Sequence, residues 1–204
     1  DIHKAIVDNL YANTNDFAHD SFLLPSFVTD LVNDNNLGRK SIKGGLYKTV
    51  LLPSGTKKYL VYDIETDKYR ERINYVFPFS DKMQKLIREA DYTLAFDELV
   101  NNHSQEAQIC LIFLLKYILY SLFVTHEVCS DILGADDVMA TGFNWCPPIA
   151  LYRALSEVTD VKSLIRERLN PNIDIDKLFE RIKSSKYDFR PFFKTSILGG
   201  LSNG

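Results

Sequence analysis

The sequence is poor in cysteine, and this scarcity limits the classes of protein to which it can belong. Its three cysteines, Cys110, Cys129 and Cys146, occur without any CxxC pair. An odd number of isolated cysteines is not typical of a disulfide framework or of a zinc site, and it favours a reducing compartment. We therefore expect a cytoplasmic location, with Cys129 and Cys146 as small buried side chains that have no activating partner.

Positive charge is not in excess either, because 24 Lys and Arg stand against 27 Asp and Glu, for a net charge of -3. A nucleic-acid-binding domain usually carries a basic surplus or a basic stripe. We therefore expect no nucleic-acid partner.

Histidine is also scarce, and its spacing does not fit a metal site. The four histidines are His3, His19, His103 and His126. None of them lies at HxxxH or HExxH spacing, so we expect no metal ligands among them. We interpret each as a structural or surface histidine. A catalytic pair of histidine and carboxylate would have to come from residues far apart in the sequence.

The sequence lacks GxGxxG, the glycine-rich turn of dinucleotide-binding folds. In the loop 38–45, Gly38 and the pair Gly44-Gly45 bracket the cations Arg39, Lys40 and Lys43. No long helix follows to direct its N-terminus at a phosphate. Two readings remain open. In one, the glycines form turns that start a strand and the cations are solvated; in the other, the cations lie near an anionic ligand or partner.

One long apolar run is present, from Ile109 to Val124. It is shorter than the roughly 20 residues that a bilayer span needs, and Lys116 lies at its middle. We therefore predict a buried core helix, capped by Ser104, and no membrane span. In the segment that follows, we predict Trp145 as a core anchor, and Asp136 and Asp137 as acids in the first turn of a short helix.

Helical periodicity dominates the rest of the chain. We predict helices over 1–12, from Pro25 to about 34, and over 81–89, 92–100, 135–141, 149–156, 162–169 and 175–183. Strands over 46–52 and 58–63, joined by a reversal at 53–56, predict a hairpin. We expect 63–78 to be irregular, Ser80 to cap the helix over 81–89, and the tail from Lys186 to end in a loose segment, 199–204.

Two blocks of the sequence resemble a known family. The block Leu37–Tyr47 (LGRKSIKGGLY) is similar to the GRKSGKGFY motif in the C-terminal domain of 3-hydroxyacyl-CoA dehydrogenases, with Ile42 in place of a glycine and two residues, Gly-Leu, in place of one Phe. The block Asp136–Trp145 (DDVMATGFNW) is similar to the DIDxAMxxGFGW block of the same family, from which Asn144 departs. The residues that follow Trp145 do not continue the family pattern.

The resemblance implies a mainly α fold: a helical bundle of the 6-phosphogluconate dehydrogenase C-terminal-like type, with a small β-hairpin near residues 46–63. The order of the blocks fits family members that carry two tandem helical copies. It implies the end of a first copy plus the hairpin over 1–79, a second copy over 80–170, and a C-terminal helix and loose tail over 171–204. We expect the chain to be part of a longer protein.

In that family a separate N-terminal domain binds NAD and carries the catalytic His–Glu pair, and neither segment occurs here. The resemblance therefore implies the helical part of an NAD-dependent 3-hydroxyacyl-CoA dehydrogenase of fatty-acid β-oxidation, with no catalytic residue in this chain. We expect it to shape the acyl-CoA site, with Arg39, Lys40 and Lys43 binding substrate, and to make homodimer or pseudo-dimer contacts. The alternative is a non-catalytic helical interaction or dimerisation module.

Overall fold

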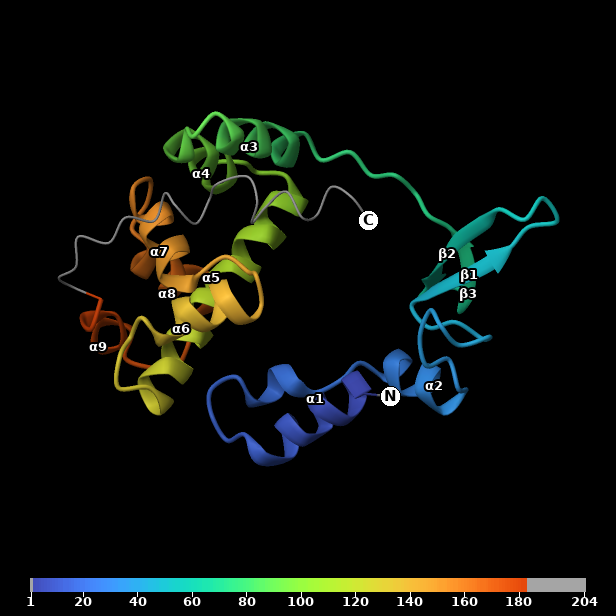
Figure 1. Ribbon diagram of the computed structural model, residues 1–204. Helices are drawn as coiled ribbons and strands as arrows, with labels where there is room; N and C mark the ends of the chain where they lie inside the picture. Colours follow the sequence, from blue (N-terminus) through green and yellow to red (C-terminus); the bar gives the residue numbers. More distant parts are fainter. Residues whose placement is uncertain (1, 183–204) are drawn as a thin grey trace. The chain divides into compact units, whose positions relative to one another are not determined.

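Residues 2–182 are described by a computed structural model, which divides into two units at Val76–Phe77 (Figure 1). Unit 1 contains α1 (Ile2–Asn13), η1 (His19–Phe22), α2 (Ser26–Asn33), β1 (Tyr47–Leu51), β2 (Lys57–Asp63) and β3 (Lys68–Glu71). Unit 2, from Phe77 onward, contains α3 (Pro78–Arg88), α4 (Tyr92–Val100), α5 (Gln105–Val128), α6 (Gly134–Asp137), the π-helical turn η2 (Val138–Gly142), α7 (Pro148–Ser156), α8 (Val161–Leu169) and α9 (Ile175–Glu180). The prediction of a mainly helical chain is confirmed, and the particular bundle type stays a prediction.

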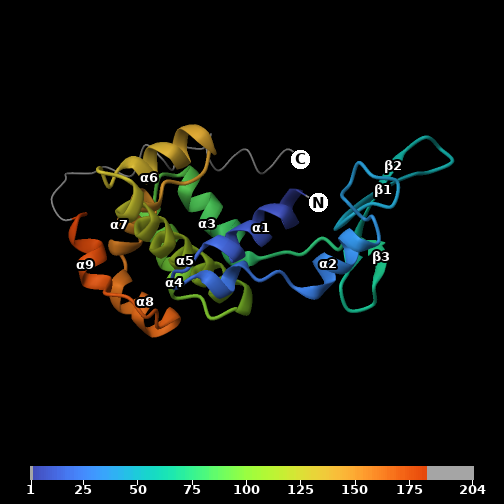
Figure 2. The ribbon, with the colours of Figure 1, turned by 90° about the horizontal axis from the view of Figure 1, so that it is seen from below.

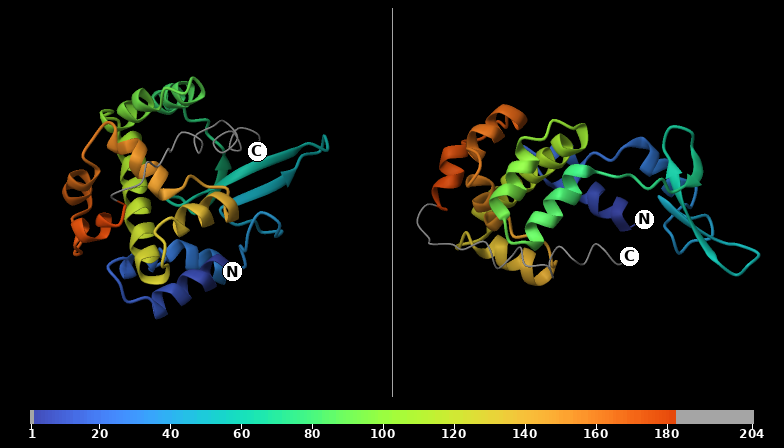
Figure 3. Two further views of the ribbon diagram at one scale, coloured as in Figure 1. Left: turned by 60° about the vertical axis from the view of Figure 1, so that its left-hand side comes forward. Right: turned by 90° about the horizontal axis from the view of Figure 1, so that it is seen from above.

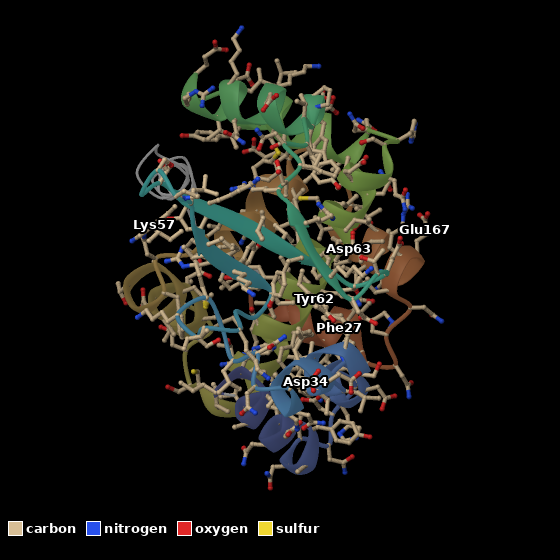
Figure 4. The ribbon with its side chains drawn as sticks, turned by 90° about the vertical axis from the view of Figure 1, so that its right-hand side faces the viewer. Phe27, Asp34, Lys57, Tyr62, Asp63 and Glu167 are labelled. Atoms are coloured by element: carbon tan, nitrogen blue, oxygen red, sulfur yellow. The ribbon has the colours of Figure 1, made fainter. Side chains whose placement is uncertain are left out.

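Unit 1 contains an antiparallel sheet in the order β1-β2-β3, and Figure 4 labels the two ends of β2 at Lys57 and Asp63. The predicted hairpin is confirmed: β1 pairs with β2 across a turn in which Gly55 takes a φ of 82°. The expectation that 63–78 is irregular was wrong for β3. The sequence of this strand has no apolar alternation, so its place in the sheet depends on its pairing with β2. Two side-chain interactions join the strands: Arg70 Nε donates to Asp63 Oδ2 at 2.8 Å, and Lys58 forms an ion pair with Glu71.

Unit 1 has little apolar core among its described residues. Leu31 is its buried hydrophobic residue, and helix α1 has no buried residue at all. Ile2 and Ile6 lie one turn apart on α1, and both are exposed. Most of the apolar burial of the described chain therefore belongs to unit 2.

Helix α5 organises unit 2, where it contacts α4, α6, α7, α8 and α9. Its side chains buried at helical spacing are Ala107, Leu111, Leu115, Ile118, Leu119, Leu122 and Thr125. Figure 3 shows α3 and α4 side by side at the end of unit 2 where α5 begins. The prediction that this helix is buried in the core is confirmed for the face that these residues form. Within residues 2–182, α5 is also the helix long and apolar enough to cross a bilayer by length and composition alone.

Side-chain caps set the beginnings of several helices in unit 2. Ser104 caps α5 as predicted, and Asp91, Asp160 and Asp174 cap α4, α8 and α9. The predicted cap Ser80 was wrong. Helix α3 begins earlier, because Pro78 supplies the fixed φ that suits a first helical position.

Ion pairs join α8 and α9, the last two helices of the described chain. Asp176 of α9 accepts from Lys162 at 2.9 Å and from Arg166 at 2.7 Å, both on α8. Figure 2 shows α8 next to α9. These two ion pairs hold the pKa of Asp176 below its usual range. Helix α9 ends at Glu180, whereas the predicted helix reaches 183; its last residue and the predicted loose tail lie outside the described residues.

Candidate apolar binding groove

An open apolar groove of about 470 Å³ lies between helix α5 and the segment 139–145 of unit 2. It is lined by Phe113, Leu114, Tyr117, Met139, Phe143 and Trp145. Phe113 is 67% exposed, Phe143 69% and Trp145 48%. Large aromatic side chains are usually buried, and exposed apolar clusters of this kind mark binding sites.

The α5 wall of the groove belongs to a face of the helix that the core does not use. Ile109, Phe113 and Lys116 follow one another at helical spacing, and all three are exposed. The core face begins at Ala107 and Leu111. Helix α5 therefore builds the core with one face and leaves the large apolar side chains of Ile109 and Phe113 exposed on another.

The opposite wall is shaped by an irregular piece of backbone. The π-helical turn η2 ends at Gly142, and Asn144 then takes a positive φ of 49°. This reversal lets the backbone N–H of Trp145 donate to the carbonyl oxygen of Met139 at 2.9 Å. Met139 and Trp145 are thus brought to one wall, and π-helical turns of this kind recur at functional sites.

A hydrogen bond ties this wall to α5. The hydroxyl of Tyr117 donates to the carbonyl oxygen of Cys146 at 2.6 Å. Burial raises the pKa of Tyr117, and the nearby Cys146 and Asp136 raise it further. Burial, assisted by Asp136, also raises the pKa of the Cys146 thiol to about 12. Both groups stay protonated at neutral pH, so neither supplies a nucleophile or a base to the groove.

Asp136 anchors the same segment to helix α7. Asp136 is 3% exposed, and its carboxylate accepts the backbone N–H of Ile149 at 2.8 Å and of Ala150 at 3.3 Å. Those N–H groups lie in the first turn of α7, whose own N-cap residue, Pro147, provides no side-chain cap. The sequence predicted only the local effect of Asp136 on its own short helix, and this longer-range cap was missed.

The structure corrects the prediction for Trp145, which is a wall of the groove rather than a core anchor. The exposure of Trp145 has a local cause. Trp145 stands on a loop, between the left-handed Asn144 and the Pro147–Pro148 pair that starts α7, so no helix face directs it inward. Cys129 and Cys146 were expected to be buried, and both are partly exposed; Cys110, Cys129 and Cys146 are all free.

The cations predicted to bind substrate lie in unit 1, in the loop before β1. The guanidinium of Arg39 lies 5.8 Å from the centroid of the Tyr59 ring, and Lys43 Nζ donates to the carbonyl oxygen of Asp34 at 2.8 Å. Lys40 is exposed. Their role in binding the phosphates of CoA stays a prediction.

Residues 2–182 contain no group of three or more His, Cys, Asp or Glu side chains able to hold a metal. His19 Nδ1 lies 2.7 Å from the carbonyl oxygen of Thr14, and its ring stacks on Tyr11. His126 Nδ1 lies 3.6 Å from the Glu127 carboxylate at the end of α5. These contacts fit structural or surface histidines.

NAD does not fit the described residues. A dinucleotide site of the usual kind needs parallel strands joined through a helix by a glycine-rich turn. The sheet of unit 1 is antiparallel throughout, and its β1–β2 connection is a short turn. No step of a reaction with NAD is therefore assigned to these residues.

Comparison with family models, with curated proteins and with solved structures finds no match. The likeness to 3-hydroxyacyl-CoA dehydrogenases therefore rests on the two sequence blocks alone.

Proposed function

We propose that this chain is a non-catalytic binding part of an NAD-dependent 3-hydroxyacyl-CoA dehydrogenase of fatty-acid β-oxidation, and that its groove holds the acyl chain. One observation carries the proposal. Three of the groove's lining residues, Met139, Phe143 and Trp145, come from the block that resembles this family.

The chemistry of the groove supports an aliphatic ligand. Its lining is aromatic and aliphatic, with the adaptable thioether of Met139 among the rings. The lining has two polar side-chain groups: the hydroxyl of Tyr117, which donates a hydrogen bond to the Cys146 carbonyl oxygen, and the indole N–H of Trp145. A ligand in the groove is therefore recognised by burial of apolar surface, and nothing in the lining is set up to react with it.

In this proposal the redox step takes place elsewhere. The parent enzyme oxidises the 3-hydroxyl of a 3-hydroxyacyl-CoA to a ketone and transfers a hydride to NAD, which a separate domain binds. The contribution of this chain is to hold and orient the acyl chain, which lowers the entropic cost of reaction on that neighbouring domain. The chain alone is expected to be inactive.

Trp145 makes the proposal directly testable because the sequence has one tryptophan. Titration with 3-hydroxydecanoyl-CoA should shift the Trp145 fluorescence to shorter wavelength as the ligand removes water from the ring. Phe113→Ala should weaken the affinity about tenfold, as the loss of an apolar wall predicts. Leu94→Ala is the matched control, since Leu94 is an exposed apolar residue of α4 outside the groove lining, and its affinity should not change.

Two results would count against the proposal. If Phe113→Ala binds 3-hydroxydecanoyl-CoA as tightly as the wild type does, the groove is not the site that binds the acyl chain. Production of NADH from 3-hydroxydecanoyl-CoA and NAD by the isolated chain would contradict the placement of the chemistry on another domain.

A second function is favoured by the exposure of Phe113 and Phe143, which resemble anchors for a partner helix. In this alternative the groove is a helical interaction or dimerisation surface with no role in substrate binding. Sedimentation analysis distinguishes the two. The alternative predicts a dimer that Phe113→Ala dissociates, together with an acyl-CoA affinity that this substitution leaves unchanged.

A further inference from the structure

The loop 38–45 of unit 1 is closed on itself by hydrogen bonds. The backbone N–H of Gly38 donates to the carbonyl oxygen of Gly44 at 2.9 Å, and the hydroxyl of Ser41 lies 2.9 and 2.7 Å from the carbonyl oxygens of the same two residues. The hydroxyl of Tyr69, on β3, lies 2.8 Å from the carbonyl oxygen of Gly45. The backbone of the loop is thus held in one arrangement, with little backbone entropy left to lose on binding.

The outermost side chain of this fixed loop is apolar. Ile42 is 98% exposed, although isoleucine is among the residues most often buried. It replaces the glycine of the resembled motif, so the side chain is an addition to that pattern. Arg39, Lys40 and Lys43 lie within three positions of it, and all three are exposed. Three exposed cations thus flank this apolar residue in the sequence of the loop.

Two more exposed aliphatic residues flank the loop, one before its start and one after its end. The backbones of Gly38 and Gly45 cross so closely that a Cβ added to Gly45 would lie 2.6 Å from the Gly38 Cα atom. Leu37 and Leu46 are the next residues outward from this crossing, and both are exposed. The segment 37–46 therefore combines three exposed aliphatic side chains with three cations on one closed loop.

We propose that the segment 37–46 docks the protein peripherally on an anionic lipid bilayer. Ile42 enters the boundary between headgroups and acyl chains, while Arg39, Lys40 and Lys43 meet lipid phosphates and anionic headgroups. Lys43 keeps donors for this role, because its ammonium has three N–H groups and uses one on the Asp34 carbonyl. This inference goes beyond the proposed function and does not depend on it.

The phosphates of free CoA share the chemistry of a lipid headgroup. Binding of free CoA would explain the three cations of the loop but not the exposed Ile42. A bilayer also accounts for the exposed Ile42, since it offers apolar depth beneath a layer of negative charge, which free CoA does not. The structure therefore favours the bilayer as the occupant of this surface.

The test measures sedimentation of the full chain with vesicles of phosphatidylserine and phosphatidylcholine in equal parts, and with vesicles of phosphatidylcholine alone. We expect binding to the anionic vesicles only, weakened by added salt. Ile42→Gly should lower the partition coefficient about tenfold through lost apolar burial. Lys40→Ala should lower it about fivefold, as expected for one cation near an anionic surface.

Ile64→Gly is the matched control, because Ile64 is 57% exposed in the same unit but stands between Asp63 and Glu65 in the β2–β3 turn. Its partition coefficient should equal that of the wild type. Circular dichroism checks that each variant keeps its secondary structure, and Ile42→Ser repeats the test with a residue that does not add the flexibility of glycine.

Several results would overturn the proposal: no sedimentation with anionic vesicles, equal sedimentation with both kinds of vesicle, or an Ile42→Gly variant that binds like the wild type. Loss of free-CoA binding in Lys40→Ala, without any vesicle binding by the wild type, would assign the cations to CoA instead. The Trp145 titration with acyl-CoA should be unchanged in Ile42→Gly, so failure of this inference is distinguishable from failure of the proposed function.

Discussion

The carboxylate of Asp136 accepts the backbone N–H of Ile149 at 2.8 Å, so helix α7 is capped by a residue thirteen positions earlier in the chain. The segment between these two residues carries Met139, Phe143 and Trp145, which line the groove. Asp136 therefore fixes one wall of the groove to the core of unit 2.

Asp136→Asn should lower the free energy of unfolding by about 2 kcal/mol, because the amide keeps one acceptor oxygen and directs N–H groups at buried donors. Asp137→Asn is its matched control. Asp137 is the exposed neighbour in the same turn, and its substitution should change the free energy of unfolding by less than about 0.5 kcal/mol. Urea unfolding of both variants measures the difference. Equal free energies in the two variants would show that the cap is not a significant anchor.

The left-handed conformation of Asn144, with φ of 49°, gives a second prediction. Asn144→Ala should destabilise the protein by about 1 kcal/mol, because an alanine Cβ crowds the backbone there. Asn144→Gly should be tolerated, since glycine adopts positive φ freely. Thermal unfolding measures stability, and the Trp145 emission wavelength reports whether the wall moves. A stable Asn144→Ala variant with unchanged emission would mean that this backbone conformation is not required.

Local signals predicted much of the fold and little of the groove. The cap at Ser104 and the helical spacing of the α5 core are local features of the sequence, and both predictions hold. The orientation of Trp145 depends on a π-helical turn and on one left-handed residue, which periodicity does not reveal. The cap by Asp136 depends on packing of α6 against α7, a contact that the sequence spacing cannot define.

The strand β3 was not predicted from the sequence, for a related reason. Its sequence, KYRE, has no alternation of apolar residues, and its place in the sheet comes from pairing with β2. The salt bridge between Arg70 and Asp63 joins the two strands, and such a cross-strand pair becomes visible only once the register is known.

The Cys146 thiol predicts how stability responds to alkaline pH. Its pKa is raised from 9.0 to about 12 in the folded chain, so the unfolded chain loses this proton at lower pH than the folded chain does. The stabilising contribution is complete below pH 9 and disappears as pH rises toward 12, at no more than about 1.4 kcal/mol per pH unit. Urea unfolding between pH 7 and pH 10.5 should therefore show a decline that Cys146→Ala reduces.

Part of that decline should persist in Cys146→Ala, because burial also raises the pKa of Tyr117. A Cys146→Ala variant with the same pH dependence as the wild type would indicate that folding does not raise the pKa of this thiol.

The most direct test of acyl binding in the groove is a series of Trp145 fluorescence titrations with 3-hydroxyacyl-CoA esters of four, six, eight and ten carbons, with free CoA as the reference. If the groove buries the chain, each added pair of carbons should strengthen binding about tenfold until the groove is filled, and free CoA should leave the emission wavelength unchanged. An affinity that does not depend on chain length, or an equal response to free CoA, would contradict the account.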